Sequence, residues 1–147
     1  MDLFYNFSDT FMDYISNSLS ETEKLAKKFL TENPDVKLVG LVGNLGSGKT
    51  AFVRSIAKAL GVKRNITSPT FVIMKIYPVE NRNLVHIDAY RLSDYEDLEA
   101  IGYNELVVDE NNLIFIEWPE RVFSQFPDDM KIINFEYIDE NKRKISF

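Results

Sequence analysis

The sequence predicts an α/β fold: a three-layer sandwich in which helices cover a mostly parallel sheet with antiparallel edge strands. Two observations carry this prediction. The run GNLGSGKT at residues 43–50 satisfies the G-x-x-x-x-G-K-[ST] pattern of a phosphate-binding loop, and it stands between an apolar run and a helix-like run. Strand-like and helix-like segments also alternate in the first half of the chain, whereas strands dominate later. Together they indicate a P-loop NTPase-like sandwich.

The pattern of apolar and turn-forming residues then gives each element in order. A short strand at residues 14–19 precedes a helix at residues 20–30, whose start has capping-box spacing from Ser20. A buried strand at residues 36–42 enters the loop, and a helix at residues 50–60 leaves it and ends at Gly61. The remaining elements are strands at residues 71–77 and 84–88, a short helix at residues 95–101 closed by Gly102, a strand at residues 113–117, and two late strands near residues 131–137 and 142–147 that could close an edge.

Length and composition favour one domain over residues 1–147, with residues 1–12 as a possible N-terminal appendage. The chain has 147 residues, 45% of them apolar, which is enough for a sizeable core. It has no cysteine, which excludes disulfides and thiolate metal sites. No apolar run approaches the roughly 20 residues of a membrane span, and the N-terminus lacks the basic start of a signal peptide. We therefore expect a cytoplasmic protein without membrane contact.

The formal net charge of −6 argues against a stand-alone binder of nucleic acid, because phosphate contacts need a basic face. Two basic clusters stand out in the sequence, and we interpret both as solvated faces. They are Lys24, Lys27 and Lys28, and Lys142, Arg143 and Lys144.

Phosphate binding accounts for the residue types of the loop at residues 43–50. Gly43, Gly46 and Gly48 are expected to permit positive φ and a close approach of the backbone to a ligand, so that successive N–H groups surround a phosphate. Lys49 would reach the β- and γ-phosphates, and Thr50 would offer a hydroxyl to Mg²⁺. The nucleotide-binding residues expected here are Asn44, Leu45, Gly46, Ser47, Gly48, Lys49, Thr50 and Ala51.

A second metal anchor is expected at the carboxyl end of a buried strand, and two strands end in an acid. These acids are Asp88 and Glu117, and both would lie at the same rim of a parallel sheet as the loop. One would hold Mg²⁺, directly or through water, and the other would orient the attacking water. With Lys49 they form the expected catalytic set, and Thr50, Glu117 and Asp88 form the expected metal set. The competing interpretation is that acids simply follow buried strands as solubilising residues.

Four other features near these acids allow two interpretations each. His86, the one histidine, is interpreted as a packed, hydrogen-bonded imidazole, because one histidine cannot form a zinc site. Arg91 favours a structural ion pair with Asp88 over a catalytic role. Residues 67–70 (TSPT) are either a turn or a switch-like loop that senses the γ-phosphate. Trp118 is either a core filler or a stacking platform.

Taken together, four ordered motifs resemble the TsaE family of bacterial ATPases of tRNA threonylcarbamoyladenosine biosynthesis. The motifs are GNLGSGKT, then Ser68-Pro69-Thr70-Phe71, then residues 86–92 (HIDAYRL), then Glu117-Trp118-Pro119-Glu120. The resemblance runs from about Ser20 to Glu120. It implies an ATP-hydrolysing subunit that supports modification of adenosine 37 in tRNAs reading codons that begin with A.

The resemblance also implies site residues, cofactors and partners. Thr50 and Glu117 match the family's Mg²⁺ ligands, Asp88 matches an acid needed for hydrolysis, and Trp118 matches a tryptophan that contributes to activity. Thr22 matches a threonine near the nucleotide. ATP and Mg²⁺ are the implied cofactors. A TsaB–TsaD-type complex is the implied partner, and tRNA is met only through that complex.

Departures from the family pattern are small, and other classes fit less well. Ala51 replaces a second threonine after the lysine, Ala89 replaces a usual leucine, and residues 1–12 have no counterpart in the commonly shorter family N-terminus.

A small-molecule P-loop kinase would need an arginine-bearing lid, and no arginines cluster after Arg54. A GTP-type switch would need N-K-x-D, and residues 141–144 (NKRK) lack the acid.

Overall fold

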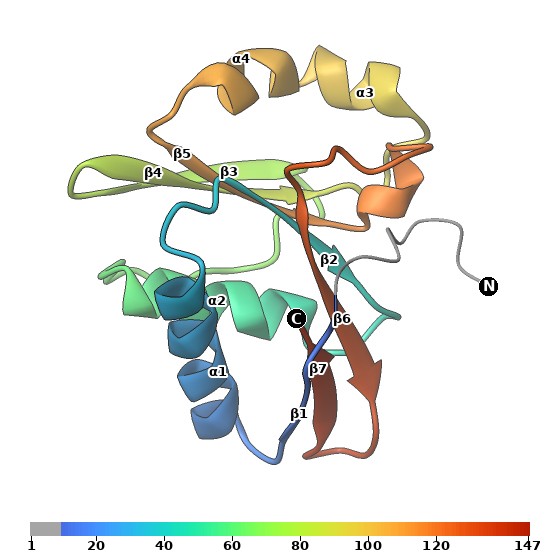
Figure 1. Ribbon diagram of the computed structural model, residues 1–147. Helices are drawn as coiled ribbons and strands as arrows, with labels where there is room; N and C mark the ends of the chain where they lie inside the picture. Colours follow the sequence, from blue (N-terminus) through green and yellow to red (C-terminus); the bar gives the residue numbers. More distant parts are fainter. Residues whose placement is uncertain (1–9) are drawn as a thin grey trace.

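The computed structural model of the protein describes residues 10–147 and contains one twisted sheet between two layers of helices (Figure 1). The strands are β1 (Asp13–Ser16), β2 (Leu38–Val42), β3 (Met74–Val79), β4 (Arg82–Asp88), β5 (Asn112–Glu117), β6 (Lys131–Tyr137) and β7 (Arg143–Ser146). The helices are α1 (Leu19–Glu32), α2 (Lys49–Ala59), α3 (Tyr95–Ala100) and α4 (Tyr103–Val108), with a 3₁₀ turn η1 (Pro119–Arg121). The predicted three-layer α/β class is confirmed.

The seven strands of the described chain lie in the order β1-β7-β6-β2-β5-β4-β3. The four central strands β6, β2, β5 and β4 are parallel to one another, and β1, β7 and β3 join by antiparallel pairing. One prediction needs correcting. The two late strands do not simply close an edge, because β6 pairs with β2 inside the sheet and only β7 and β1 continue toward that margin.

The sheet separates two hydrophobic cores, one under each helical layer. Helices α1 and α2 cover one face, and the short helices α3 and α4 cover the other (Figure 1). Strand alternation assigns side chains to these faces. Leu84 and Phe115 pack in the core with α1 and α2, whereas Val85 and Ile114 pack on the opposite face. His86 and Asp88 follow Leu84 in steps of two, so they lie on the α1–α2 face.

Several element boundaries differ from the sequence prediction, and one helix was not expected. Helix α1 begins at Leu19, because Ser18 is its N-cap and accepts a hydrogen bond from the Glu21 N–H, so the capping serine is not Ser20. Strand β3 begins at Met74, three residues later than expected, because Ile73 has φ of 68° and ends a turn that follows Pro69. Helix α4 was not expected. It begins directly after Gly102, whose φ of 93° closes α3 as predicted.

Part of the predicted N-terminal appendage lies outside the described residues, since the structure describes the chain from residue 10. Met12 exchanges two backbone hydrogen bonds with Phe147, which extends the β1–β7 pairing by one step. Among the helices described, none is long and apolar enough to cross a membrane.

Candidate nucleotide and metal site

The phosphate-binding loop connects the carboxyl end of β2 to the start of α2, as the sequence predicts. Gly46 and Gly48 have φ of 75° and 105°, a region that L side chains rarely adopt. Gly43 differs from the expectation, because it is absent from the glycines with positive φ. Its requirement is space: a Cβ there would lie 2.6 Å from the Phe135 carbonyl oxygen and 2.6 Å from Ser47 Oγ.

The first turn of α2 presents its backbone N–H groups to the loop. Gly48 is the N-cap and supplies no side-chain hydrogen bond, so the positive end of the helix is left to a ligand. Asn44 and Leu45 are exposed on the outer side of the loop. Ser47 is buried, and its Oγ has no hydrogen-bond partner among the described residues. Ala51 follows in the first turn and offers its backbone.

Lys49 is buried at the mouth of the loop. Its ammonium donates to the carbonyl oxygens of Gly43 and Asn44, the latter at 2.9 Å, and lies 4.2 Å from the ring centroid of Trp118. Burial lowers the pKa of Lys49 from its usual value, against the attraction of Glu117, Glu120 and Asp88. An ammonium held among these groups is suited to an anionic ligand, which would replace the hydration it has lost.

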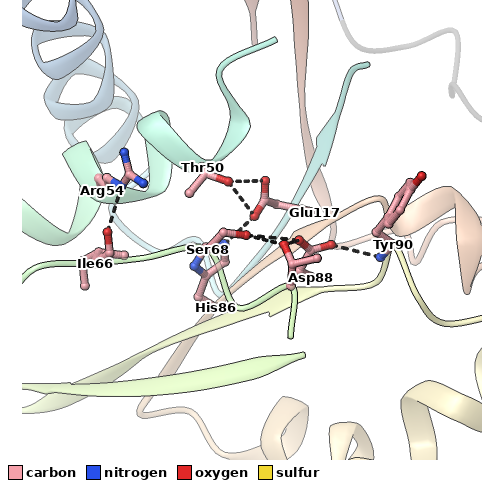
Figure 2. Close-up of polar contacts among 9 residues, drawn as sticks. Thr50, Arg54, Ile66, Ser68, His86, Asp88, Tyr90 and Glu117 are labelled. Carbon is pink, nitrogen blue, oxygen red and sulfur yellow. Dashed lines mark hydrogen bonds and ion pairs between the residues drawn. The ribbon is translucent and has the colours of Figure 1, made fainter. Parts of the chain in front are cut away.

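Glu117 lies opposite the first turn of α2, and its carboxylate is held from two sides. Thr50 Oγ1 donates to both oxygens, at 2.9 and 3.2 Å. His86 Nε2 lies 2.8 Å from Oε2 and donates to it, because a carboxylate only accepts (Figure 2). The expectation of a packed, hydrogen-bonded His86 is therefore confirmed. Its Nδ1 has no partner among the described residues.

Asp88 ends β4 beside Glu117, with which it is in register across the parallel pair. Its Oδ1 accepts the Tyr90 N–H at 3.0 Å, and its Oδ2 accepts the Thr70 hydroxyl at 2.8 Å and the Ser68 hydroxyl at 3.4 Å (Figure 2). The turn before β3 is thereby attached to the acid through two hydroxyls.

The donor set at this rim suits a hard divalent cation. Mg²⁺ prefers oxygen ligands and usually takes one or two from protein, the rest coming from phosphates and water. The Thr50 hydroxyl and the Glu117 carboxylate are adjacent oxygen donors of this kind. In the described part of the chain, no group of three or more His, Cys, Asp or Glu could hold a metal by itself. Water and the phosphates of a bound nucleotide would supply the remaining ligands of a Mg²⁺ ion held by Thr50 and Glu117.

Trp118 occupies a sharp bend at the end of β5, with φ of 60° and ψ of 48°. Its ring is half-buried. It contacts the Lys49 ammonium and the ring of Tyr90, and the two ring centroids lie 5.2 Å apart. Arg121 in turn lies 4.8 Å from the Tyr90 ring centroid. Trp118 also packs against the core of the α3–α4 face. Both interpretations of this residue, filler and platform, therefore have a physical basis.

The structure does not bring every expected residue to the loop. Thr22 is buried on α1, and the contact described for its hydroxyl is with Ser16 Oγ at 2.8 Å. Arg91 forms no ion pair with Asp88 in the part of the chain described; its guanidinium lies 4.8 Å from the Phe71 ring centroid instead. The expected ion pair is wrong because Asp88 is already bonded by Thr70, Ser68 and the Tyr90 N–H.

Two residues near the loop were not singled out from the sequence. Burial raises the pKa of Glu120, although Lys49 lies close enough to lower it, and its Oε2 has no partner among the described residues. Arg143 was interpreted as part of a solvated cluster, yet it is half-buried and its Cγ is 3.6 Å from where a Cβ on Gly48 would stand. The position of Glu120 in the motif after Trp118 was a sequence signal that could have placed it near the loop. No sequence signal placed Arg143 there.

Comparison with known proteins gives the family. A family model described as threonylcarbamoyl adenosine biosynthesis protein TsaE matches residues 16–145. The tRNA threonylcarbamoyladenosine biosynthesis protein TsaE of Rickettsia felis is 39% identical over 133 residues, covering 90% of this chain and 77% of the relative. The protein of the same name from Aquifex aeolicus is 37% identical over 135 residues, covering 90% and 92%.

A solved structure gives the same result for the fold. The crystal structure of Bacillus subtilis YdiB superposes with a TM-score of 0.74 at 26% sequence identity, covering 94% of this chain and 84% of that one. The family model also spans the phosphate-binding loop and both acids, since all of them lie within residues 16–145. The protein is thus a member of the TsaE family, as the four motifs indicated.

Proposed function

We propose that this protein is the ATP-binding and ATP-hydrolysing subunit of tRNA threonylcarbamoyladenosine biosynthesis, working in the cytoplasm with a TsaB–TsaD-type complex. The observation that supports this most is the hydrogen bond of 2.9 Å between Thr50 and Glu117 at the start of α2. This bond joins residues that are 67 positions apart in sequence. It lies at the N-terminus of α2, beside the N–H groups of the phosphate-binding loop.

Each residue then has a role that follows from its position. The N–H groups of residues 44–51 bind the phosphates, and Lys49 neutralises charge on the β- and γ-phosphates. Thr50 and Glu117 would hold Mg²⁺, which when bound would neutralise charge at the phosphoryl oxygens. Asp88 accepts a hydrogen bond from the attacking water and orients it, in a site whose other acid is committed to the metal.

Three further residues would position the nucleotide and the acids. His86 holds the Glu117 carboxylate from the side opposite Thr50, which is how an outer partner fixes a metal ligand. Trp118 offers a ring face beside Lys49. Thr22 is proposed to lie near the nucleotide on the basis of the family resemblance alone.

We further propose that hydrolysis by the isolated chain is slow and that the partner pair accelerates it. The described hydrogen bonds of Arg54 and Arg143, which lie on α2 and beside Gly48, go to the carbonyl oxygens of Ile66, Asp139 and Lys142, so among the described residues no arginine is held toward the phosphate positions. P-loop enzymes that lack such an arginine in cis receive it, or the ordering of a loop, from a partner. The turn bonded to Asp88 is a segment that a partner could order.

The test is ATP hydrolysis by the wild type, Lys49→Ala and Glu117→Ala, each with and without a purified TsaB–TsaD pair and tRNA. We expect magnesium-dependent hydrolysis by the wild type that rises with the partners. Each variant should be slower by at least about 100-fold, the order of magnitude expected when a transition-state interaction is removed. Normal turnover by Lys49→Ala would contradict the proposal. Transfer of labelled phosphate to a nucleoside or sugar acceptor instead of water would favour a small-molecule kinase.

A further inference from the structure

A basic groove lies along α2 beyond its first turn, next to the nucleotide site. It encloses about 560 Å³ between the last turns of α2 and the segment that follows it to residue 67. Four cationic side chains line it, all of them exposed: Arg54, Lys58, Lys63 and Arg64. The other lining residues are apolar, amide or hydroxyl, and none is acidic. We refer to these four cations and their surroundings as the basic groove.

The cations of the basic groove are mostly free of carboxylate partners. The described ion pairs include one of the four, Lys58, which binds Glu23 at 2.9 Å. The two guanidinium groups are held by backbone carbonyls instead: Arg54 Nε donates to Ile66 O at 2.8 Å, and Arg64 Nη2 donates to Ile76 O at 3.3 Å. Their charges are therefore fixed in place without being neutralised.

A fifth cation lies at the rim of the groove. Lys75, on β3, donates to the hydroxyl of Thr67 at 2.5 Å, and Thr67 is itself a lining residue. Five positive groups gathered in this way are unusual in a chain of net charge −6. At physiological ionic strength the Debye length is about 8 Å, so a bound anion feels these neighbours more than the distant acids.

We propose that the basic groove binds the phosphodiester backbone of RNA, and that this protein therefore contacts the tRNA of its pathway directly. The inference rests on the family's place in tRNA modification and does not require ATP hydrolysis. Guanidinium and ammonium groups in a row are the usual contacts to successive phosphates. It departs from the expectation that tRNA is met only through the partner complex.

The chemistry of the groove favours a nucleic-acid strand over an acidic protein. Its lining is cationic and contains no acidic or aromatic side chain, whereas the centre of a protein interface is depleted of charged residues and enriched in aromatic ones. A backbone segment with two or three phosphates is matched to four or five cations. A protein partner that used this face would instead need contacts well beyond the groove.

The groove and the hydrolysis site share helix α2 and the segment that follows it. Arg54 lies one turn after Thr50 on α2, and its partner Ile66 is two residues before Ser68, which bonds Asp88 (Figure 2). RNA in the groove would therefore contact the segment at residues 66–68, whose Ser68 hydroxyl donates to Asp88. Residues 66–68 are therefore in contact with both sites.

The experiment measures fluorescence anisotropy of a labelled, unmodified tRNA transcript titrated with the full chain, without nucleotide, at 50 and 150 mM salt. The wild type is expected to bind with an affinity that falls steeply with salt. The double variant Lys63→Ala/Arg64→Ala should bind at least about tenfold more weakly at 50 mM salt, and its salt slope should fall by about one for each phosphate that it no longer neutralises. Its circular dichroism and its ATP affinity should match the wild type.

The matched control is Lys24→Ala/Lys27→Ala, which removes the same charge from an exposed face of α1. It should change RNA affinity less than about twofold. Equal losses in the two double variants would overturn the proposal, because net charge alone would explain them. So would loss of RNA binding in Lys49→Ala, which would assign the RNA to the phosphate-binding loop. Absence of wild-type RNA binding, with binding to the TsaB–TsaD pair abolished in Lys63→Ala/Arg64→Ala, would assign the groove to a protein.

Discussion

Charged side chains in this protein are buried together at one rim of the sheet. Lys49, Asp88 and Glu117 are each at most 5% exposed, and Glu120 is half-buried beside them. Burying a charge is costly unless hydrogen bonds and opposite charges compensate for it. Compensation is thorough at Asp88 and Glu117, through Thr70, the Tyr90 N–H, Thr50 and His86, but it is incomplete at Glu120. Such fixed, dry groups are the usual means of stabilising a phosphoryl transition state.

Glu120 allows a pH test of this description. Because burial raises its pKa from 4.5, folding favours the protonated form, and the stability associated with that proton is lost as pH rises through the folded pKa. Glu120→Gln should therefore unfold at higher urea than the wild type at pH 7. The difference should shrink as pH falls toward 4.5 and below, where the wild-type carboxyl is protonated in both states. Urea titrations at several pH values measure it, and a difference that grows on acidification would contradict the assignment.

At the scale of elements, periodicity and turn residues located most helices and strands. The strand entering the loop, the helix leaving it and its Gly61 cap were confirmed, because a strong local pattern dictates them. The predicted boundaries were wrong where tertiary contacts determine the end of an element. The end of β1 and the start of α1 depend on Ser16, Ser18 and Thr22 bonding across the junction, which no pattern in the sequence reveals.

Two serines test the start of α1 directly. Ser18→Ala should lower the free energy of unfolding by about 1 kcal/mol, because it removes the side-chain acceptor for the Glu21 N–H. Ser20→Ala is the matched control, an exposed serine one residue inside the helix, and should change stability by less than about 0.5 kcal/mol. Chemical denaturation of both variants gives the comparison. A larger loss in Ser20→Ala would restore the capping box to the position that the sequence favoured.

The whole molecule depends on contacts between segments far apart in the chain, and here sequence reasoning reached its limit. Motifs placed both acids at the correct rim, since parallel strands share their carboxyl ends. They could not give the order of strands, so the insertion of β6 beside β2 was missed. Nor could they pair His86 with Glu117, because that contact requires β4 and β5 to be neighbours in a particular register. The basic groove was missed for another reason: its four cations fall within residues 54–64, but they are too widely spaced to form a visible basic run in the sequence.

The central claim is that a triphosphate and its metal bind between the loop, Thr50 and Glu117. The most direct measurement is a crystal structure of the protein with a non-hydrolysable ATP analogue and Mg²⁺ at saturating concentration. We predict phosphates surrounded by the N–H groups of residues 44–51, Lys49 on the β- and γ-phosphates, and Mg²⁺ on the Thr50 hydroxyl and the Glu117 carboxylate. Density for the analogue elsewhere on the protein, with this loop free of phosphate, would contradict the account.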